Sequence, residues 1–139
     1  MPRATRAQDG QQEQMVKDIL FFVNQHREEI GKPPLKLSDL ICEEAIDHSK
    51  DMAKHKVAFG HDGFEERVAI LRHKLKPYHA AGENVAYGQL SAEKVVKLWL
   101  KSPGHRKNIE GDYNLTGIGV SEAKDGTIFY TQMFLQNDE

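Results

Sequence analysis

The spacing of hydrophobic residues changes from a helical to a strand period in the C-terminal part of this 139-residue chain, and the change constrains the fold more than any other feature. Between residue 12 and about residue 101, apolar residues recur every three or four positions, which is typical of amphipathic helices. Residues 116–122 and 127–135 alternate instead, as strands do, and Lys124-Asp125-Gly126 between them is a hairpin turn signal. The pattern therefore predicts helices followed by an antiparallel hairpin.

Capping and turn residues divide the helical part into four predicted helices. Ser38 and Ser91 are good N-cap residues, because a serine side chain accepts a hydrogen bond from a main-chain N–H of the first turn. Asp62, followed three residues later by Glu65, resembles a capping box before the third helix. The sequence Ser102-Pro103-Gly104 is expected to stop the last helix. The predicted helices cover residues 12–30, 38–53, 64–75 and 91–101.

A glycine-rich segment at residues 82–89 is too short for a helix and predicts a buried strand that leads into a loop. With the hairpin, this strand predicts an α+β fold in which helices cover an antiparallel sheet of about three strands. Residues 1–11 are polar and are expected to form a flexible tail. We therefore expect a single domain over residues 12–139.

Charge and cysteine content exclude several classes of protein. The 19 basic and 21 acidic residues give a net charge of -2, which argues against a nucleic-acid binder. No apolar run approaches the ~18 residues of a membrane span. The single cysteine, Cys42, excludes an intramolecular disulfide scaffold and a multi-cysteine zinc site. The first 14 residues lack the apolar run of a secretory signal, which leaves two alternatives: a cytoplasmic protein, or a secreted protein whose signal has been removed.

Three side chains stand out as candidates for a metal site. His61 and His105 lie in breaks rich in glycine or proline, where loops carry side chains over pockets. Glu83 lies between apolar neighbours, where a carboxylate is costly to bury unless it is paired or bound to a metal. Two neutral imidazoles and one carboxylate suffice for an open zinc site. The alternative is three unrelated residues at loop edges.

Motifs of common catalytic sites are absent from the sequence. There is no HExxH, GxSxG, GxxxxGK[ST] or GxGxxG pattern. No residue is therefore assigned a catalytic role from a motif.

Several segments together carry a family resemblance, and they follow one another through residues 15 to 135. They are VNQHR (23–27), PPLKLSDL (33–40), the stretch 45–53, GHDGF (60–64) with Glu66-Arg67, AGENVAYGQ (81–89), VVKLWLKSPGHRKNI (95–109), GIGV (117–120) and YTQMF (130–134). In these segments the chain resembles the CAP superfamily of cysteine-rich secretory, antigen 5 and pathogenesis-related proteins, whose domains are also called SCP-like. The SPGHR form, the short length and the single cysteine are similar to the bacterial branch.

The resemblance implies a three-layer α-β-α sandwich with a central cavity lined by two histidines and two acidic residues. Carried over by position, these are His61, His105 and Glu83, while Ser102, three residues after Trp99, stands where the second acid is expected. Glu65 or Glu66 could reach the cavity in its place.

Other residues are given supporting roles by the same resemblance. Asn84, Arg106 and Asn108 are expected to hold the loops around the cavity, with Asn84 lining it. Gln132, on the last strand, lines the cavity floor or is an edge residue.

The function implied by the resemblance is a binding module. The cavity would bind a divalent cation, zinc or magnesium, through His61, His105 and Glu83, and a neighbouring groove would bind a lipid, a peptide or a cell-wall component. With Ser102 in place of the second acid no general base is assigned, so binding is favoured over catalysis. The alternatives are a metal-dependent hydrolase of peptides or esters and a purely structural interaction domain. Family resemblance implies a secreted, cell-surface or periplasmic location, with a cytoplasmic one left open, and the oligomeric state is not predicted.

Overall fold

The computed structural model describes residues 10–138. The predicted polar tail lies mostly outside this range, and its last two residues belong to the first described helix. None of the described helices is both long and apolar enough to cross a membrane. The elements are α2 (Gly10–Glu29), β1 (Lys36–Leu37), α3 (Asp39–Ala53), α4 (Phe64–Lys74), β2 (Tyr78–Tyr87), α5 (Ala92–Lys101), α6 (Pro103–Ile109), β3 (Leu115–Glu122) and β4 (Ile128–Asn137).

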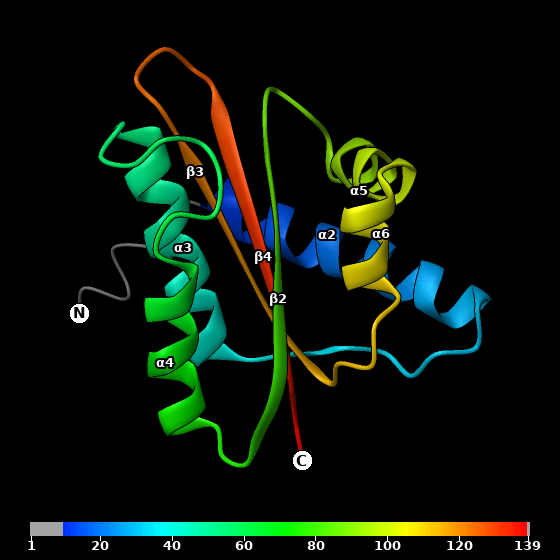
Figure 1. Ribbon diagram of the computed structural model, residues 1–139. Helices are drawn as coiled ribbons and strands as arrows, with labels where there is room; N and C mark the ends of the chain where they lie inside the picture. Colours follow the sequence, from blue (N-terminus) through cyan, green and yellow to red (C-terminus); the bar gives the residue numbers. More distant parts are fainter. Residues whose placement is uncertain (1–9, 139) are drawn as a thin grey trace.

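Three layers make up the domain, as the α+β sandwich prediction requires (Figure 1). Helices α3 and α4 lie on one face of the sheet, and α2, α5 and α6 lie on the other. The sheet has four strands in the order β1-β3-β4-β2. β2 and β3 both pair antiparallel with β4, which confirms the predicted hairpin, and β1 pairs parallel with β3. The prediction of about three strands missed β1, because two residues are too few to show an alternating pattern.

The sheet is buried on both faces, and its hydrophobic core is divided accordingly. Strand β4 is central, and its residues 129–135 are all buried. On one face, Trp99, Tyr130 and Phe134 belong to the cluster shared with α2 and α5. On the other face, smaller clusters pack Met133 and Phe129 toward α3 and α4. Gln132 therefore cannot be an edge residue, and that alternative is wrong.

Helix boundaries follow the predicted caps in two cases and depart from them in two others. The Ser38 and Ser91 side chains accept hydrogen bonds from the N–H groups of Ile41 and Lys94, as predicted. The capping box at Asp62 is wrong, because α4 is capped by Gly63, a left-handed residue with φ 83° that offers no side chain.

The second departure is at the end of α5. The sequence Ser102-Pro103-Gly104 ends α5 as predicted, but it also begins α6, which was not expected. Pro103 occupies the first turn of α6, where a missing N–H costs nothing because that N–H has no helical partner. The helix carries His105, so its position matters for the candidate site.

Two glycines of β3 allow α3 to lie directly on the sheet. A Cβ atom on Gly117 would collide with main-chain atoms of Ile41 and Cys42, and one on Gly119 would collide with main-chain atoms of Ala45 and Ile46. The Ser49 hydroxyl donates a hydrogen bond to the carbonyl of Gly119 at 2.9 Å. The close approach of α3 to β3 is therefore stabilised by a polar contact. It would be lost if a larger residue replaced Gly117 or Gly119.

We predict that Gly119→Ala lowers the free energy of unfolding by about 3 kcal/mol, because the colliding atoms are main chain and cannot rotate away. Gly104→Ala is the matched control, since no atom lies within 4 Å of a Cβ at that position. We expect it to leave stability unchanged or to raise it by up to about 1 kcal/mol, because Gly104 lies in α6 and alanine favours a helix more than glycine does. Urea denaturation of both variants is the measurement, and equal stability losses would contradict the argument.

Candidate functional site

A buried ion pair between β2 and α4 is the centre of the candidate site. The Glu83 side chain is 1% exposed. The Arg67 guanidinium donates two hydrogen bonds to it, from Nε to Oε2 at 2.9 Å and from Nη2 to Oε1 at 2.8 Å. This bidentate geometry is the strongest form of a carboxylate–guanidinium contact, and it gives the buried Glu83 carboxylate a counter-charge.

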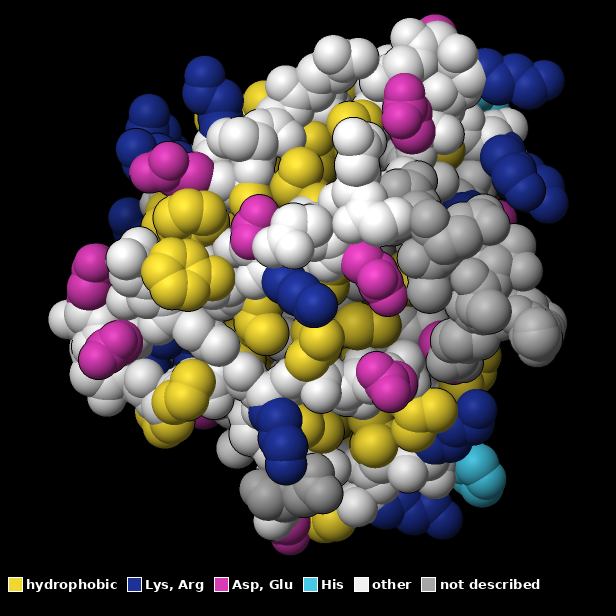
Figure 2. All heavy atoms as spheres, turned by 180° about the vertical axis from the view of Figure 1, so that it is seen from behind, with side chains coloured by type: hydrophobic (Ala, Val, Ile, Leu, Met, Phe, Trp, Pro, Cys, Tyr) yellow, Lys and Arg dark blue, Asp and Glu magenta, His cyan; other side chains and the backbone are white. Residues whose placement is uncertain are grey.

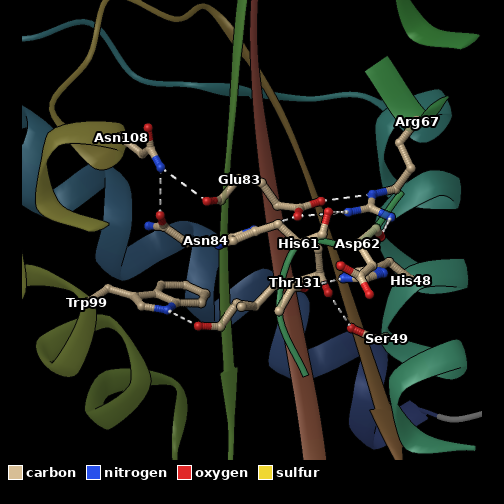
Figure 3. A network of polar contacts seen from close by, with 12 residues as sticks. His48, Ser49, His61, Asp62, Arg67, Glu83, Asn84, Trp99, Asn108 and Thr131 are labelled. Atoms are coloured by element: carbon tan, nitrogen blue, oxygen red, sulfur yellow. Dashed lines mark hydrogen bonds and ion pairs between the residues drawn. The ribbon is translucent and has the colours of Figure 1, made fainter. Parts of the chain in front are cut away.

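Arg67 also holds the loop that precedes α4. Its Nη1 donates to the carbonyl of Asp62 at 2.8 Å, and its Nη2 lies 3.4 Å from the carbonyl of His61. Figure 3 shows Arg67, Asp62 and His61 gathered on one side of β2. The ion pair thus fixes the loop as well as the helix.

His61 is the exposed member of the cluster. Its Nδ1 lies 2.8 Å from Oε1 of Glu83, and its side chain is 50% exposed. Because an ionised carboxylate only accepts hydrogen bonds, Nδ1 is the donor. In a neutral ring, Nε2 then keeps its lone pair and is available to a ligand or a cation.

His105 approaches the site from α6. The side chain is half-buried, and its main-chain carbonyl accepts a hydrogen bond from Nδ2 of Asn84 at 3.1 Å. Burial lowers the pKa of His105, and the charge that His61 can carry lowers it further. A lowered pKa favours the neutral form of the His105 imidazole at pH 7.

Asn84 and Asn108 connect α6 to β2 on the other side of the strand, as Figure 3 shows. Asn108 Nδ2 donates to Oδ1 of Asn84 at 2.8 Å and to the carbonyl of Glu83 at 3.1 Å. The indole N–H of Trp99 donates to the carbonyl of Val85 at 3.1 Å. These side chains satisfy the outward carbonyls of an edge strand. Arg106 is exposed on α6.

The remaining expected site residues do not join the Glu83 carboxylate. Ser102 is half-buried between α5 and α6 and makes no side-chain cap. Gln132 is fully buried and donates from Nε2 to the Thr116 hydroxyl at 3.0 Å, while its Oε1 has no partner among the described residues. It pairs with Asn84, so the pleat places it on the opposite sheet face from Glu83. Glu65 and Glu66 are exposed on the first turn of α4.

His48 is a further member of the cluster, and it was not among the candidate site residues of the sequence analysis. It is buried on α3, and its Nε2 donates to the carbonyl of Gly60 at 2.7 Å, next to His61. Burial is the main cause that lowers the pKa of His48, and the nearby Arg67 charge also lowers it. His48 therefore supports the 60–63 loop as a neutral donor.

The donor set fits a cation only in part. Both oxygens of Glu83 are engaged by Arg67 and one also by His61, so the carboxylate is not free to act as the expected third metal ligand. Within residues 10–138, no group of three His, Cys, Asp or Glu side chains is arranged to hold a metal ion. The imidazole nitrogens of His61 and His105 are the donors that remain.

One pocket of the described residues lies elsewhere, at the C-terminal end of β4. It has a volume of about 280 Å³. Its lining residues are Arg27, Lys32, Pro33, Asp112, Tyr113, Asn114, Gln136, Asn137 and Asp138. It does not include the His61–Glu83 cluster.

Comparison with known proteins gives consistent matches over most of the chain. The sequence model of the cysteine-rich secretory protein family (CAP) matches residues 20–134. The Bacillus subtilis protein YkwD is 36% identical over 121 residues, which are 86% of this chain and 46% of YkwD. The chain therefore spans less than half the length of this relative.

Solved structures share the fold. An extracellular protein of Bacillus anthracis that contains an SCP domain is 30% identical, with a TM-score of 0.71 over 91% of this chain and 41% of that chain. The structure described as NaASP2 with Zn²⁺ is 13% identical, with a TM-score of 0.63 over 88% of this chain and 79% of that chain. At that identity the second match shows the fold alone.

We predict that Arg67→Met lowers the free energy of unfolding by about 3 to 5 kcal/mol, because it leaves the Glu83 carboxylate buried without its counter-charge. Lys97→Met is the control, since the Lys97–Glu93 pair is exposed and contributes less than about 1 kcal/mol. The double variant Arg67→Met/Glu83→Met should recover much of the loss, because no charge is then buried alone. Denaturant titration checks all three, and a double variant as unstable as Arg67→Met would contradict the reasoning.

The two histidines with lowered pKa predict a pH dependence of stability. The unfolded chain binds protons at these imidazoles near their ordinary pKa of 6.5, and the folded chain binds them only at lower pH. Stability is therefore complete above pH 6.5 and decreases as the pH falls below it. His48→Gln, which keeps an N–H donor but cannot titrate, should weaken this decrease between about pH 7 and pH 5. His73→Gln, at an exposed position, is the control, and an equal effect of both changes would refute the assignment.

Proposed function

The chain belongs to the cysteine-rich secretory protein (CAP) family, and on that basis we propose that it is a non-catalytic binding domain of the extracellular type. One observation carries the proposal: the hydrogen bond from Nδ1 of His61 to Glu83, made by a ring that is half exposed. It holds the ring in one orientation and directs the Nε2 lone pair away from the carboxylate. The Bacillus anthracis relative, described as extracellular, supports a location outside the cytoplasm.

A divalent cation at this site would be held by the imidazoles of His61 and His105. Glu83 would then act as the carboxylate that orients a metal-binding histidine, which is a common arrangement in metal sites. Nitrogen donors favour zinc over magnesium, since magnesium prefers oxygen ligands and keeps its water. The zinc in the description of NaASP2 is in line with this preference.

Two protein nitrogens leave coordination positions open on a zinc ion. A ligand with a carboxylate or phosphate oxygen could complete the coordination, and such groups occur in lipids, peptides and cell-wall components. Nucleic acid is not proposed as a partner. Figure 2 shows basic and acidic side chains interspersed on the face that it presents, without an extended basic stripe.

Catalysis is not part of the proposal. Metal-dependent hydrolysis needs a general base within hydrogen-bond reach of the attacking water. The carboxylate of Glu83 is neutralised by the Arg67 guanidinium, and Ser102 offers no base at the expected second position. In this proposal His61 and His105 bind the cation and Glu83 orients His61, and no residue is assigned as a proton acceptor.

Zinc titration by calorimetry at about pH 7.5, where imidazoles are neutral, tests the proposal. We expect one zinc site that is weakened at least about tenfold by His61→Ala and by His105→Ala, because each change removes one of two protein ligands. The exposed His73→Ala is the control and should leave the affinity unchanged.

The same titration, repeated at lower pH and with magnesium, tests whether neutral imidazoles hold the metal. Zinc affinity should fall as the pH drops below about 6.5, since protonated imidazole cannot bind a metal. Magnesium should bind more weakly than zinc. If the native chain binds no zinc, the proposal fails and the alternative of a purely structural domain is favoured.

A further inference from the structure

A pocket of about 280 Å³ lies where three segments of the chain meet at the C-terminal end of β4. Its walls come from the connection that follows α2, the connection between α6 and β3, and the end of β4. Figure 1 shows these three segments together at the lower end of the sheet. None of His61, His105 and Glu83 lines the pocket, so a ligand bound there would not occupy the proposed cation site.

Arg27 is the one buried residue of this lining, at 1% exposed. A guanidinium has five N–H donors. Four of them donate to main-chain carbonyls, which belong to Pro33, Ile109, Gly111 and Tyr113. One N–H of Nη2 is left without a partner among residues 10–138, and no carboxylate of these residues forms an ion pair with the guanidinium. The hydrogen-bond partners of this buried charge are therefore all neutral carbonyls.

The side of the guanidinium that carries the unpartnered N–H borders the pocket. Nη1 donates to the carbonyls of Ile109 and Gly111, and neither of these residues lines the pocket. Nε and Nη2 donate to the carbonyls of Pro33 and Tyr113, and both of these residues line it. The Nη2 bond is also the longest, at 3.2 Å against 2.8 Å for each of the other three. The pocket thus ends at a fixed, charged donor whose hydrogen bonds are not all used.

Three other charged side chains line the pocket. Lys32 Nζ lies 2.5 Å from Oδ1 of Asp112, so these two charges compensate each other. Asp138 Oδ1 accepts a hydrogen bond from Nε2 of His79 at 2.6 Å, while its Oδ2 has no partner among the described residues. Apart from the Lys32–Asp112 pair, the lining therefore presents a buried positive charge, that of Arg27, and an exposed negative charge, that of Asp138.

The charges of the lining favour a small molecule that carries both signs. A ligand carboxylate would accept the unpartnered N–H of Arg27 in a charge-assisted hydrogen bond. A simple anion would also meet the Asp138 carboxylate, and a simple cation would meet the Arg27 guanidinium, so each would be repelled by one of the two residues. A volume of about 280 Å³ lies just below the usual range for drug-sized ligands, which suits a molecule of amino-acid size.

We propose that this pocket binds a zwitterionic α-amino acid, with its carboxylate on Arg27 and its ammonium group on Asp138. The ammonium group would donate to Oδ2 of Asp138, the carboxylate oxygen that His79 leaves open. The amide of Gln136 lines the same pocket and supplies a neutral hydrogen-bonding group. Arg27 keeps its four carbonyl partners, so binding requires no rearrangement of the guanidinium. The pocket needs no metal, so the proposal is independent of the zinc site.

Calorimetric titration at about pH 7.5 tests the proposal, with EDTA present because free amino acids can themselves bind zinc. The probes are D-alanine and L-alanine, together with two analogues that each lack one charge. Propionate lacks the ammonium group, and alaninamide lacks the carboxylate. We expect at least one alanine enantiomer to bind with a Kd of about 1 mM or tighter. Propionate and alaninamide should bind at least about tenfold more weakly, since each loses one charged contact.

Asp138→Asn distinguishes the two ends of the ligand. It should weaken alanine binding about tenfold, because the ammonium group loses its counter-charge. It should not weaken propionate binding, because propionate has no ammonium group. Asp125→Asn is the matched control, since Asp125 is an exposed carboxylate in the β3–β4 turn, and it should leave the binding of both unchanged. Equal effects of the two variants on alanine binding would contradict the role of Asp138.

Arg27 is tested without replacing it, because its replacement would remove four carbonyl contacts. In ¹H–¹⁵N NMR spectra, the Nε–H resonance of Arg27 should shift when alanine is added. The Nε–H resonance of Arg67, a buried guanidinium outside this pocket, should not. The proposal is overturned if neither alanine enantiomer binds at about 10 mM, if propionate binds as tightly as alanine, or if alanine binds without moving the Arg27 resonance. Failure of zinc binding would not affect it.

Discussion

A carboxylate buried on an edge strand sets the conditions for the rest of the site. An unpaired charge at Glu83 would cost several kcal/mol, so a counter-charge must lie against β2. Arg67 supplies it from α4, and the same guanidinium holds the carbonyl of Asp62 in the preceding loop. The position of α4, the conformation of its loop and the orientation of His61 all follow from neutralising one side chain.

A second buried charge positions the opposite half of the site. Arg27 is 1% exposed and donates to the main-chain carbonyls of Pro33, Ile109, Gly111 and Tyr113. It thereby ties α2 to the C-terminal end of α6, while Asn84 binds the carbonyl of His105 near the start of that helix. Burial lowers the pKa of Arg27 without removing its charge, since an arginine side chain stays protonated. The two halves of the site are thus each fixed by an arginine that sequence periodicity treats as an ordinary helical residue.

What the sequence could predict was determined by local pattern. Hydrophobic period and cap residues were sufficient for α2, α3, α5 and the hairpin, because each depends on neighbours within a few residues. β1 and α6 were missed, since two residues show no period and Ser102-Pro103-Gly104 serves as a helix end and a helix start alike. The importance of Arg67 was missed as well. Its partner lies 16 residues away and is found only through the packing of α4 on β2.

The segment AGENVAY, which carried much of the family resemblance, is explained by the period of a strand. Its alternate residues Glu83, Val85 and Tyr87 face α3, α4 and the loop that holds Phe59 and His61. The residues between them face α5 and α6. There Gly82 leaves room for Asn108 and Tyr113, which a Cβ atom would displace, and Asn84 holds α6. The face with Gly82 and Asn84 therefore supports the strand against α6, and the face with Glu83 carries the ion pair and the contact to His61. Because the two sets alternate, a one-residue shift in register would exchange them, so the pairing of β2 with β4 determines the site as directly as any side chain in it.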